Sequence, residues 1–120
     1  MSECRLTATL PIPPSTNHLY DRTMRGVYLK DTVRRWRTDA AQRLDRLERW
    51  PAGLTCAAWS LDYVLCCDRR RDLDNAAKAL IDLIAAYLGI NDDCLTDLSA
   101  HKRVTPRSRQ RIEVTVTLHL

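Results

Sequence analysis

The chain has 120 residues, room for one compact domain, and its apolar fraction of 45% is that of a globular protein. It contains no run of about 18 apolar residues, which argues against a membrane span. Residues 1–9 carry charge and alternate in polarity, unlike the apolar stretch of a signal peptide. We therefore expect a single domain over residues 1–120, with no membrane contact and a cytoplasmic location.

The positive charge is unevenly distributed along the chain. The net charge is +4, and sixteen of the nineteen Lys and Arg residues are arginines. Basic residues concentrate in 34–37, 69–71 and 101–111, and no acidic residue interrupts the last of these stretches. Arginine binds two phosphate oxygens through its planar guanidinium, so such clusters suit a polyanion. Because a GC-rich coding bias also favours arginine codons, charge alone leaves nucleic-acid binding undecided.

The first half of the chain predicts two strands and a helix. Residues 5–10 alternate between polar and apolar side chains, as a half-buried strand does, and a proline-rich stretch then ends the strand. Residues 15–26 are interpreted as a loop, and residues 27–29 as a short strand. Apolar residues at helical spacing predict a helix over 31–49, with Asp31 as its N-cap.

The second half predicts a sheet and another helix. Alternation over residues 55–67 predicts a strand with one buried face. A helix is predicted over 74–88, ended by Gly89. Residues 94–104 are expected to be extended, and residues 112–120 show the cleanest alternation of all. The order strand, helix, strand, helix, strand, strand predicts an α+β (mixed α/β) fold, in which two main helices pack on a small mixed sheet.

The densest polar stretch lies where the second long strand meets the second helix. Asp72 and Asp74 are two residues apart, so in extended backbone both side chains leave the same face. Two carboxylates directed together repel each other. A hard divalent cation such as Mg²⁺, which prefers oxygen ligands, relieves that repulsion. Three consecutive arginines precede these acids, which predicts a metal site to which a phosphate backbone is drawn.

A third carboxylate has to come from elsewhere, and Asp93 follows the second helix in a turn. A helix of about 15 residues spans about 22 Å, so Asp93 reaches Asp72 only if the sheet brings the next strand back alongside. Lys78 lies four residues after Asp74, on the same helical face. A lysine there would hold a phosphate or stabilise the charge of a transition state.

Each of these residues also has a purely structural interpretation. Asp72 or Asp74 would serve as a helix N-cap, with the neighbouring acid favourable to the helix dipole. Lys78 would pair with Asp74 and Asp82, each four residues away, and residues 91–92 would form an ordinary turn. This interpretation accounts for the residues one by one but leaves the arginine triplet unexplained.

The segment Asp72-Leu73-Asp74-Asn75, preceded by three arginines and followed by Lys78, resembles the central motif of the RusA family of Holliday junction resolvases. Residues 10–20, with Pro11, Pro13, Pro14 and Asn17, are similar to the family's proline-rich loop after its first strand. Asp92-Asp93 resembles its distal acidic pair. The resemblance covers nearly the whole chain, in the same order.

The resemblance implies a dimeric, Mg²⁺-dependent endodeoxyribonuclease that nicks four-way DNA junctions symmetrically, in DNA recombination and repair. Asp72, Asp74 and Asp93 would be the metal-binding catalytic carboxylates, and Lys78 the catalytic lysine. The DNA-binding surface would include Arg69, Arg70, Arg71, Lys102 and Arg103. The stretch after Asp93 is slightly shorter than the family pattern, so no role is transferred to Asp97.

Other functions stay open at this point. A non-catalytic DNA-binding module would use the same basic clusters, with the acids as caps. A nuclease that prefers flaps, forks or RNA would share the chemistry and differ in substrate. A pure protein-interaction domain would leave the arginine triplet without a use.

The remaining reactive side chains are interpreted structurally. The five cysteines lack metal-type spacing and are expected to be buried small apolar residues. Trp36 shares the apolar stripe of the first helix and is expected in the core. His119 lies on the polar face of the last strand and is expected to be solvated. His18 and Tyr20, in the predicted loop, are candidates for DNA contact.

Overall fold

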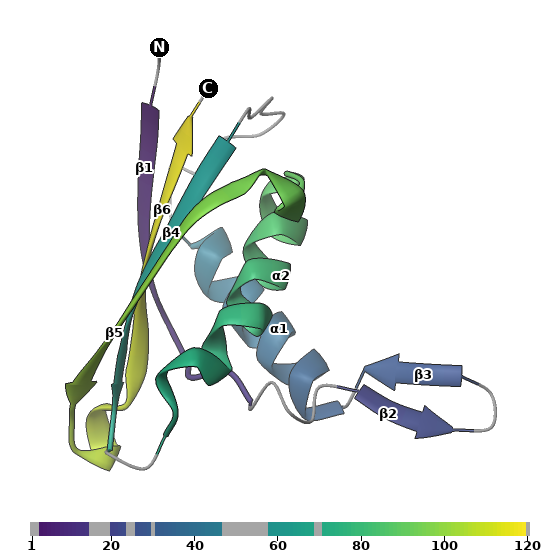
Figure 1. The fold of residues 1–120 in the computed structure, drawn as a ribbon. Coiled ribbons are helices and arrows are strands. Elements are labelled where there is room, and N and C mark those ends of the chain that lie inside the picture. The colour runs from purple at the N-terminus through teal and green to yellow at the C-terminus, as the bar shows by residue number, and fades with distance from the viewer. Residues whose placement is uncertain are drawn as a thin grey trace.

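A computed structural model of the chain describes residues 3–14, 20–23, 26–29, 31–46, 58–68 and 71–119. Figure 1 shows how the elements within these ranges are arranged. In chain order they are β1 (Glu3–Leu10), β2 (Tyr20–Thr23), β3 (Gly26–Leu29), α1 (Asp31–Asp45), β4 (Ala58–Cys67), η2 (Leu73–Ala76), α2 (Ala77–Leu88), η3 (Asp92–Cys94), β5 (Leu95–Val104), η4 (Arg107–Arg109) and β6 (Arg111–His119), where η denotes a 3₁₀-helix.

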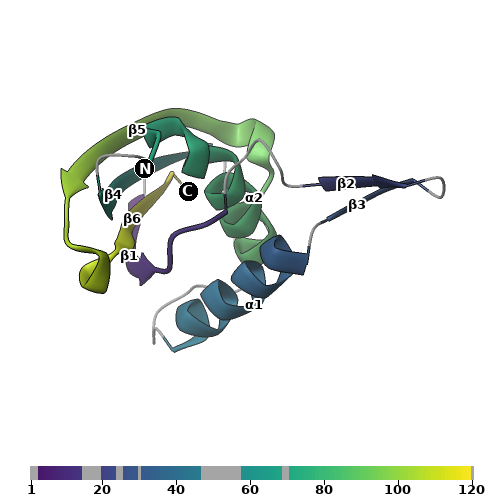
Figure 2. The same ribbon diagram turned by 90° about the horizontal axis from the view of Figure 1, so that it is seen from below.

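Four of the strands form one mixed sheet in the order β1-β6-β4-β5. β6 pairs antiparallel with both β1 and β4, whereas β5 lies parallel to β4. Both helices lie on one face of this sheet, and no described element covers the other, open face (Figures 1 and 2). β2 and β3 form a separate antiparallel hairpin that projects from the body (Figure 1). The predicted α+β class, with two main helices on a small mixed sheet, is confirmed.

The core lies between the sheet and the two helices. Alternate residues of the strands point into it, because successive side chains of a strand leave opposite faces. From β4 and β6 these are Trp59, Leu61, Tyr63, Leu65, Ile112, Val114, Val116 and Leu118. The helices contribute Val33, Trp36, Ala40, Leu44, Ala79, Leu80 and Ile84. Full burial of one large apolar side chain contributes about 1.5–3 kcal/mol, so this layer holds the helices on the sheet.

Two polar contacts fix the helices at their edges. The Trp36 indole nitrogen donates to the Pro11 carbonyl at 2.8 Å and ties α1 to the stretch after β1. The Tyr87 hydroxyl of α2 donates to the Asp45 carboxylate at the end of α1, at 2.5 Å. Burial, assisted by this hydrogen bond and the charge of Asp45, raises the pKa of Tyr87 to about 12. The expectation that Trp36 belongs to the core is confirmed.

The structure corrects some predicted element boundaries. Residues 20–23 form β2, so the expected loop over 15–26 is wrong there; pairing with β3 supplies backbone hydrogen bonds that the local pattern does not reveal. The second helix begins with the 3₁₀ turn Leu73–Ala76 rather than as an α-helix. The rest of the first predicted helix, 47–49, and the first residues of the second long strand, 55–57, lie outside the described residues.

The crossover from β4 through α2 to β5 positions the acidic residues. Trp59 lies beside Leu95 at one end of the parallel pair, and Cys67 lies beside Val104 at the other. α2 runs back from the second end to the first (Figure 1) and stops at Gly89, whose φ of 67° suits glycine. The sheet therefore returns β5 alongside β4, but the turn before β5 and the turn after β4 lie at opposite ends.

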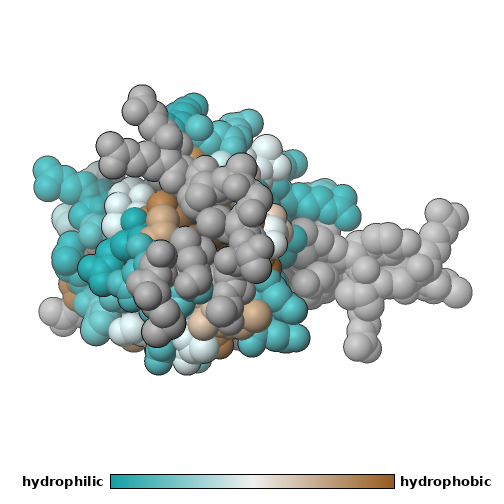
Figure 3. Space-filling view, turned by 90° about the horizontal axis from the view of Figure 1, so that it is seen from above, coloured by the Kyte–Doolittle hydropathy of each residue, from teal (hydrophilic) through white to brown (hydrophobic). Residues whose placement is uncertain are grey.

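The described surface is mainly polar. Seen from above, its residues are coloured largely as hydrophilic, with apolar colour in small separate areas (Figure 3). Among the residues whose side-chain burial the structure describes, which leaves out β2 and β3, the exposed large apolar side chains are Leu98 and Val104, at 49% and 59% exposure, and both lie on β5. None of the described helices is long and apolar enough to cross a membrane.

Candidate functional site

Asp72 and Asp74 lie in the turn that leads from β4 into α2. Asp72 occupies the N-cap position of η2 in extended conformation, yet its side chain makes no cap hydrogen bond. The N-cap position of α2 is taken by Ala76. Both aspartate side chains are exposed. A capping aspartate accepts a hydrogen bond from the first helical turn, so the interpretation of these acids as caps finds no support.

The buried Tyr63 of β4 holds this acidic turn in place. Its hydroxyl donates to the Leu73 carbonyl at 2.7 Å, and its side chain is 1% exposed. Loss of this bond would leave a polar group without a partner inside the protein. Burial raises the pKa of Tyr63, and the negative charge of Asp74 adds to the rise, which places that carboxylate near the hydroxyl. The core strand thus fixes the acidic turn.

Lys102 reaches the same turn from β5. It lies beside Leu65 in the parallel register, and its ammonium donates to the carbonyl of Arg71, one residue before Asp72. Burial raises the pKa of the Cys67 thiol, while the charges of Lys102 and Arg71 act in the opposite direction. These two exposed basic side chains therefore lie close to the end of β4, and two of the predicted DNA-binding residues come together beside Asp72.

Lys78 lies on α2, one turn beyond Asp74, and pairs with Asp82. Its ammonium is 3.3 Å from the Asp82 carboxylate, and Arg37 of α1 lies 3.6 Å from the same oxygen. The predicted pairing with Asp82 is present. Because the Lys78 side chain is 57% exposed, this pair contributes only about 0–1 kcal/mol and is easily exchanged.

Asp93 lies at the other end of α2, in η3. The Asn91 side chain accepts a hydrogen bond from the Asp93 backbone nitrogen at 2.9 Å, so Asn91 caps the short helix that stands where an ordinary turn was the structural interpretation. The Trp59 indole nitrogen donates to the Asn91 carbonyl at 3.0 Å. The side chains of Asp92 and Asp93 are exposed. This second acidic turn is therefore also fixed to β4.

A single chain does not bring Asp93 to Asp72 and Asp74. The 12 residues of α2 lie between them, which is about 18 Å at 1.5 Å per residue. Ligand oxygens lie only about 2.1 Å from a bound Mg²⁺, so one ion cannot bridge that separation. Among the described residues, no group of three or more His, Cys, Asp or Glu side chains could hold a metal ion. The expected meeting of the three acids does not occur within one protomer.

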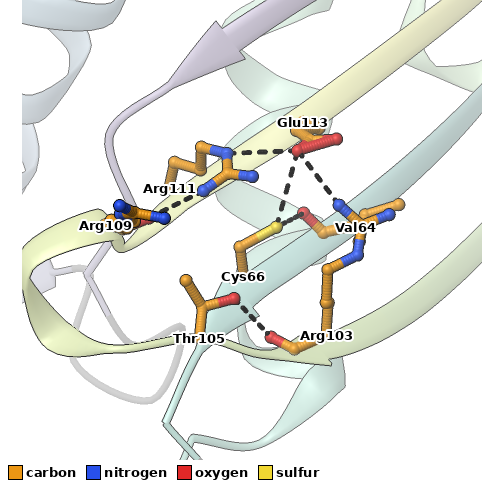
Figure 4. A network of polar contacts seen from close by, with 7 residues as sticks. All are labelled: Val64, Cys66, Arg103, Thr105, Arg109, Arg111 and Glu113. Atoms are coloured by element: carbon orange, nitrogen blue, oxygen red, sulfur yellow. Dashed lines mark hydrogen bonds and ion pairs between the residues drawn. The ribbon is translucent and has the colours of Figure 1, made fainter.

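A network centred on Glu113 holds two arginines side by side on the open face (Figure 4). Arg111 and Arg103 approach the same Glu113 oxygen at 3.1 and 3.5 Å. The buried Cys66 thiol lies 3.6 Å from that oxygen, and Arg111 also donates to the Arg109 carbonyl at 3.0 Å. One carboxylate thus orders two guanidinium groups, and the cluster keeps a net positive charge.

The basic stretch 101–111 folds onto the end of the sheet that carries Asp72. Arg107 of η4 lies 3.5 Å from the Asp68 carboxylate, at the end of β4. Arg103 and Lys102 occupy the last residues of β5, beside Cys66 and Leu65. Basic residues of β5, η4 and the turn itself therefore lie at the same end of the sheet as Asp72 and Asp74.

The predicted site residues fall into two groups at opposite ends of α2. Arg71, Lys102 and Arg103 lie at the same end as Asp72 and Asp74, whereas Asp93 lies at the other. Arg69 and Arg70 lie outside the described residues, as does His18.

Sequence reasoning missed two residues that organise this region. The alternation over residues 112–120 assigns Glu113 only to the polar face of the last strand. Its place two residues after Arg111, on the same face of a strand, was the available signal. Alternation placed Tyr63 on a buried face and gave no sign of its hydroxyl contact with the acidic turn.

The cysteine and histidine expectations can also be compared with the structure. Cys66 and Cys67 are buried as expected, Cys4 and Cys94 are half-buried, and Cys56 lies outside the described residues. The His119 side chain is 39% exposed and lies 3.4 Å from the Glu3 carboxylate. It therefore lies on the polar face of β6, as expected, with the Glu3 carboxylate beside it.

Exposed carboxylates in a turn that also carries Arg71 and is contacted by Lys102 are features of a small α+β protein that processes nucleic acid. The family model described as Endodeoxyribonuclease RusA matches residues 11–117. The chain therefore belongs to the RusA family, whose members are endodeoxyribonucleases that resolve Holliday junctions. A search of curated proteins finds no match.

Proposed function

We propose that this chain is a cytoplasmic, Mg²⁺-dependent endodeoxyribonuclease that resolves four-way DNA junctions by paired symmetric nicks, in DNA recombination and repair. One domain over residues 1–120 would carry the activity. The observation that supports this most strongly is the turn of Asp72 and Asp74. It exposes two carboxylates with no capping role, beside Arg71 and Lys102. Such a turn offers oxygen ligands for a cation next to positive charges for a phosphate.

The donor chemistry of this turn fits Mg²⁺. Asp72 and Asp74 offer hard carboxylate oxygens and are exposed. Mg²⁺ keeps several waters and needs only one or two protein carboxylates together with phosphate oxygens. When bound, it would polarise the phosphate to be cut and lower the pKa of the attacking water.

Asp93 would complete each site from a second copy of the chain. Within one protomer the acids lie at opposite ends of α2, about 18 Å apart. A two-fold axis that sets two protomers antiparallel directs Asp93 of one toward the acidic turn of its partner. It does so twice, and so creates two equal sites. Two sites match the paired nicks and the approximate two-fold symmetry of a four-way junction. The homodimer is therefore part of this proposal.

The basic side chains would bind and orient the DNA. Phosphates would be bound by Arg69, Arg70, Arg71, Lys102 and Arg103. Lys78 would exchange its exposed pair with Asp82 for the phosphate to be cut, where its charge stabilises the transition state. In-line attack of a water on phosphorus would break the P–O3′ bond and leave a 5′-phosphate and a 3′-hydroxyl.

A non-catalytic DNA-binding module is the second candidate. It is favoured by one observation, that the three predicted acids do not meet within a protomer. A nuclease for flaps or forks would share the site and differ only in substrate. Competition between a four-way junction and linear or flapped duplexes separates that possibility from the main proposal.

The test is nicking of a synthetic four-way junction with Mg²⁺ and with excess EDTA. Wild-type protein should cut only with Mg²⁺. Asp72→Asn should lose cutting by about 100-fold or more while it retains junction binding. Asp39→Asn is the matched control, because it removes the same charge from the exposed surface of α1 and should cut normally. Unchanged cutting by Asp72→Asn would remove the proposed site. Binding without any Mg²⁺-dependent cutting by the wild type would leave the DNA-binding module.

A further inference from the structure

The Asp82 carboxylate of α2 is shared by two basic side chains from different helices. The Lys78 ammonium, one turn earlier on α2, lies 3.3 Å from Asp82 Oδ2, and Nη2 of Arg37 on α1 lies 3.6 Å from the same oxygen. Figures 1 and 2 both show α1 beside α2. Among the described residues, these two cations are the ion-pair partners of Asp82. One carboxylate thus joins Lys78 to the basic stretch of α1.

The three side chains differ in how firmly they are held. Lys78 is 57% exposed, whereas Arg37 and Asp82 are 33% and 20% exposed. Arg37 faces Asp82 through Nη2, and its Nε atom is buried, without a hydrogen-bond partner in the described part of the chain. An exposed lysine on a flexible stem exchanges partners readily, whereas a half-buried planar guanidinium is held by the packing around it. Lys78 is therefore the partner that leaves, and Arg37 the one that stays.

The helix geometry directs a released Lys78 toward the acidic turn. Side chains of an α-helix lean toward its N-terminus, so Asp82 leans over Lys78, and Lys78 leans toward Asp74 one turn earlier. A phosphate bound at the acidic turn therefore approaches the Lys78 ammonium from the side opposite Asp82. Rotation of the lysine side chain is enough to move its charge from the carboxylate to the phosphate.

We infer that Arg37 is a positioning residue of the nuclease, which holds the charge of Asp82 when Lys78 moves to the phosphate to be cut. This inference rests on the proposed function, because that function gives Lys78 its role at the phosphate. When Lys78 leaves, Asp82 loses one partner and keeps the other. The exchange therefore places no unpaired carboxylate beside the DNA.

Without Arg37, the same exchange becomes unfavourable. Asp82 is only 20% exposed, and a carboxylate that is largely removed from water is costly to leave without a partner. It then retains Lys78 and repels the incoming phosphate. Arg37 thus acts on the reaction through Asp82 and Lys78, without a DNA contact of its own. The effect of losing Arg37 must therefore depend on the presence of the Asp82 carboxylate.

The test is a double-mutant cycle of single-turnover junction nicking with Mg²⁺. Arg37→Gln should lower the nicking rate of the otherwise wild-type protein by about 10-fold. In the Asp82→Asn background, the same change should lower the rate by no more than about 2-fold, because no carboxylate is left to retain Lys78. An arginine needed only to pack α1 against α2 would be as harmful to lose in either background. Equal losses in both backgrounds, or loss of cutting by Asp82→Asn alone, would overturn the inference.

Arg43 and Asp39 provide the matched control pair. Their side chains lie 3.5 Å apart on the exposed surface of α1, and no lysine shares the Asp39 carboxylate among the described residues. Arg43→Gln makes the same charge change as Arg37→Gln and should cut normally, with or without Asp39→Asn. A tenfold loss in Arg43→Gln would reduce the Arg37 effect to net charge and reject the inference. Should Arg37→Gln fail to fold, the double variant with Asp82→Asn still decides, since it leaves no unpaired charge and should cut like Asp82→Asn.

Junction binding gives a readout that does not require cutting. Fluorescence anisotropy in the Asp72→Asn background measures the slope of log Kd against log salt concentration. Lys78→Gln and Arg37→Gln should each reduce this slope by about 1, since either change removes the Lys78 contact with phosphate. With Asp82→Asn also present, Arg37→Gln should leave the slope unchanged.

The two measurements separate the inference from the proposed function. Wild-type cutting that Arg37→Gln does not slow leaves the nuclease and rejects the role of Arg37. A slope that depends on Arg37 only when Asp82 is present, in a protein that does not cut, supports the exchange at Lys78 and rejects the nuclease.

Discussion

The Tyr63 hydroxyl donates a 2.7 Å hydrogen bond to the Leu73 carbonyl, and this bond joins the centre of β4 to the turn that carries Asp72 and Asp74. Four residues earlier on the same face, Trp59 makes the corresponding bond to Asn91, at 3.0 Å. Each end of α2 is thus tied to one buried strand, next to an acidic turn. The positions of the acids depend on two aromatic residues of the core.

Removal of the Tyr63 hydroxyl should therefore affect cutting more than stability. Tyr63→Phe is expected to lower the free energy of unfolding by about 1 kcal/mol. It should lower the nicking rate by about 10- to 100-fold, because the acidic turn loses its anchor. Tyr87→Phe, which removes another tyrosine hydrogen bond far from the turn, is the matched control. Urea unfolding and single-turnover nicking measure the two effects, and equal losses in both variants would contradict a positioning role for Tyr63.

If each site takes its acids from both subunits, a mixture of two different inactive variants should regain activity. Asp72→Asn and Asp93→Asn should each be inactive alone. Mixed dimers contain one site with both changes and one intact site, so an equal mixture should recover about a quarter of wild-type nicking. Its products should be single nicks rather than paired ones, which denaturing gels of end-labelled junctions distinguish. A mixture as inactive as its components would mean that the three acids do not work across the dimer.

Lys102 is expected to increase the affinity of the protein for DNA, whatever the DNA sequence. Lys102→Gln should weaken junction binding and reduce the slope of log Kd against log salt concentration by about 1, because one phosphate contact is lost. Arg43→Gln, on α1 and paired with Asp39, should leave that slope unchanged. Binding is measured by fluorescence anisotropy in the Asp72→Asn background, so that no substrate is consumed. An unchanged slope would place Lys102 outside the DNA interface.

The raised pKa of Tyr87 predicts that the folded protein loses stability at alkaline pH. Burial raises its pKa from 10.0 to about 12, so the folded protein holds the phenol proton more tightly than the unfolded chain does. This contribution is complete below pH 10 and is lost as the pH rises toward 12. Urea unfolding from pH 8 to 11.5 should show a steeper decline for wild type than for Tyr87→Phe. Parallel curves would contradict the assignment.

Much of the fold could be predicted from the sequence, because most helices and strands bury only one face and so show a regular pattern of apolar residues. The strict alternation from Ile112 to Leu118 and the apolar stripe of α1 reflect contact with a single core face, and both elements were predicted correctly. The β2 strand was missed, since its partner β3 lies only three residues further along and its four residues carry no alternation of their own.

The local motif around Asp72 was also visible, but its relation to Asp93 was not. Sequence spacing measures distance along the chain, whereas the meeting of two turns depends on the direction of the strands that bear them. A parallel β5 leaves Asp93 at the far end of α2, and no residue pattern within one chain encodes the partner that the proposed site requires. The contacts of Lys102 with Arg71 and of Glu113 with Arg103 arise from strand pairing and were hidden for the same reason.

The two tethers from β4 make α2 a spacer of fixed length. If either end of the helix were not anchored, the turn next to it could change position. Because both ends are anchored, the number of helical turns sets the distance between the two acidic turns. In a dimer that shares its acids, this span determines how far apart the two cutting centres stand. The length of this one helix therefore determines which DNA geometry fits between the two cutting centres.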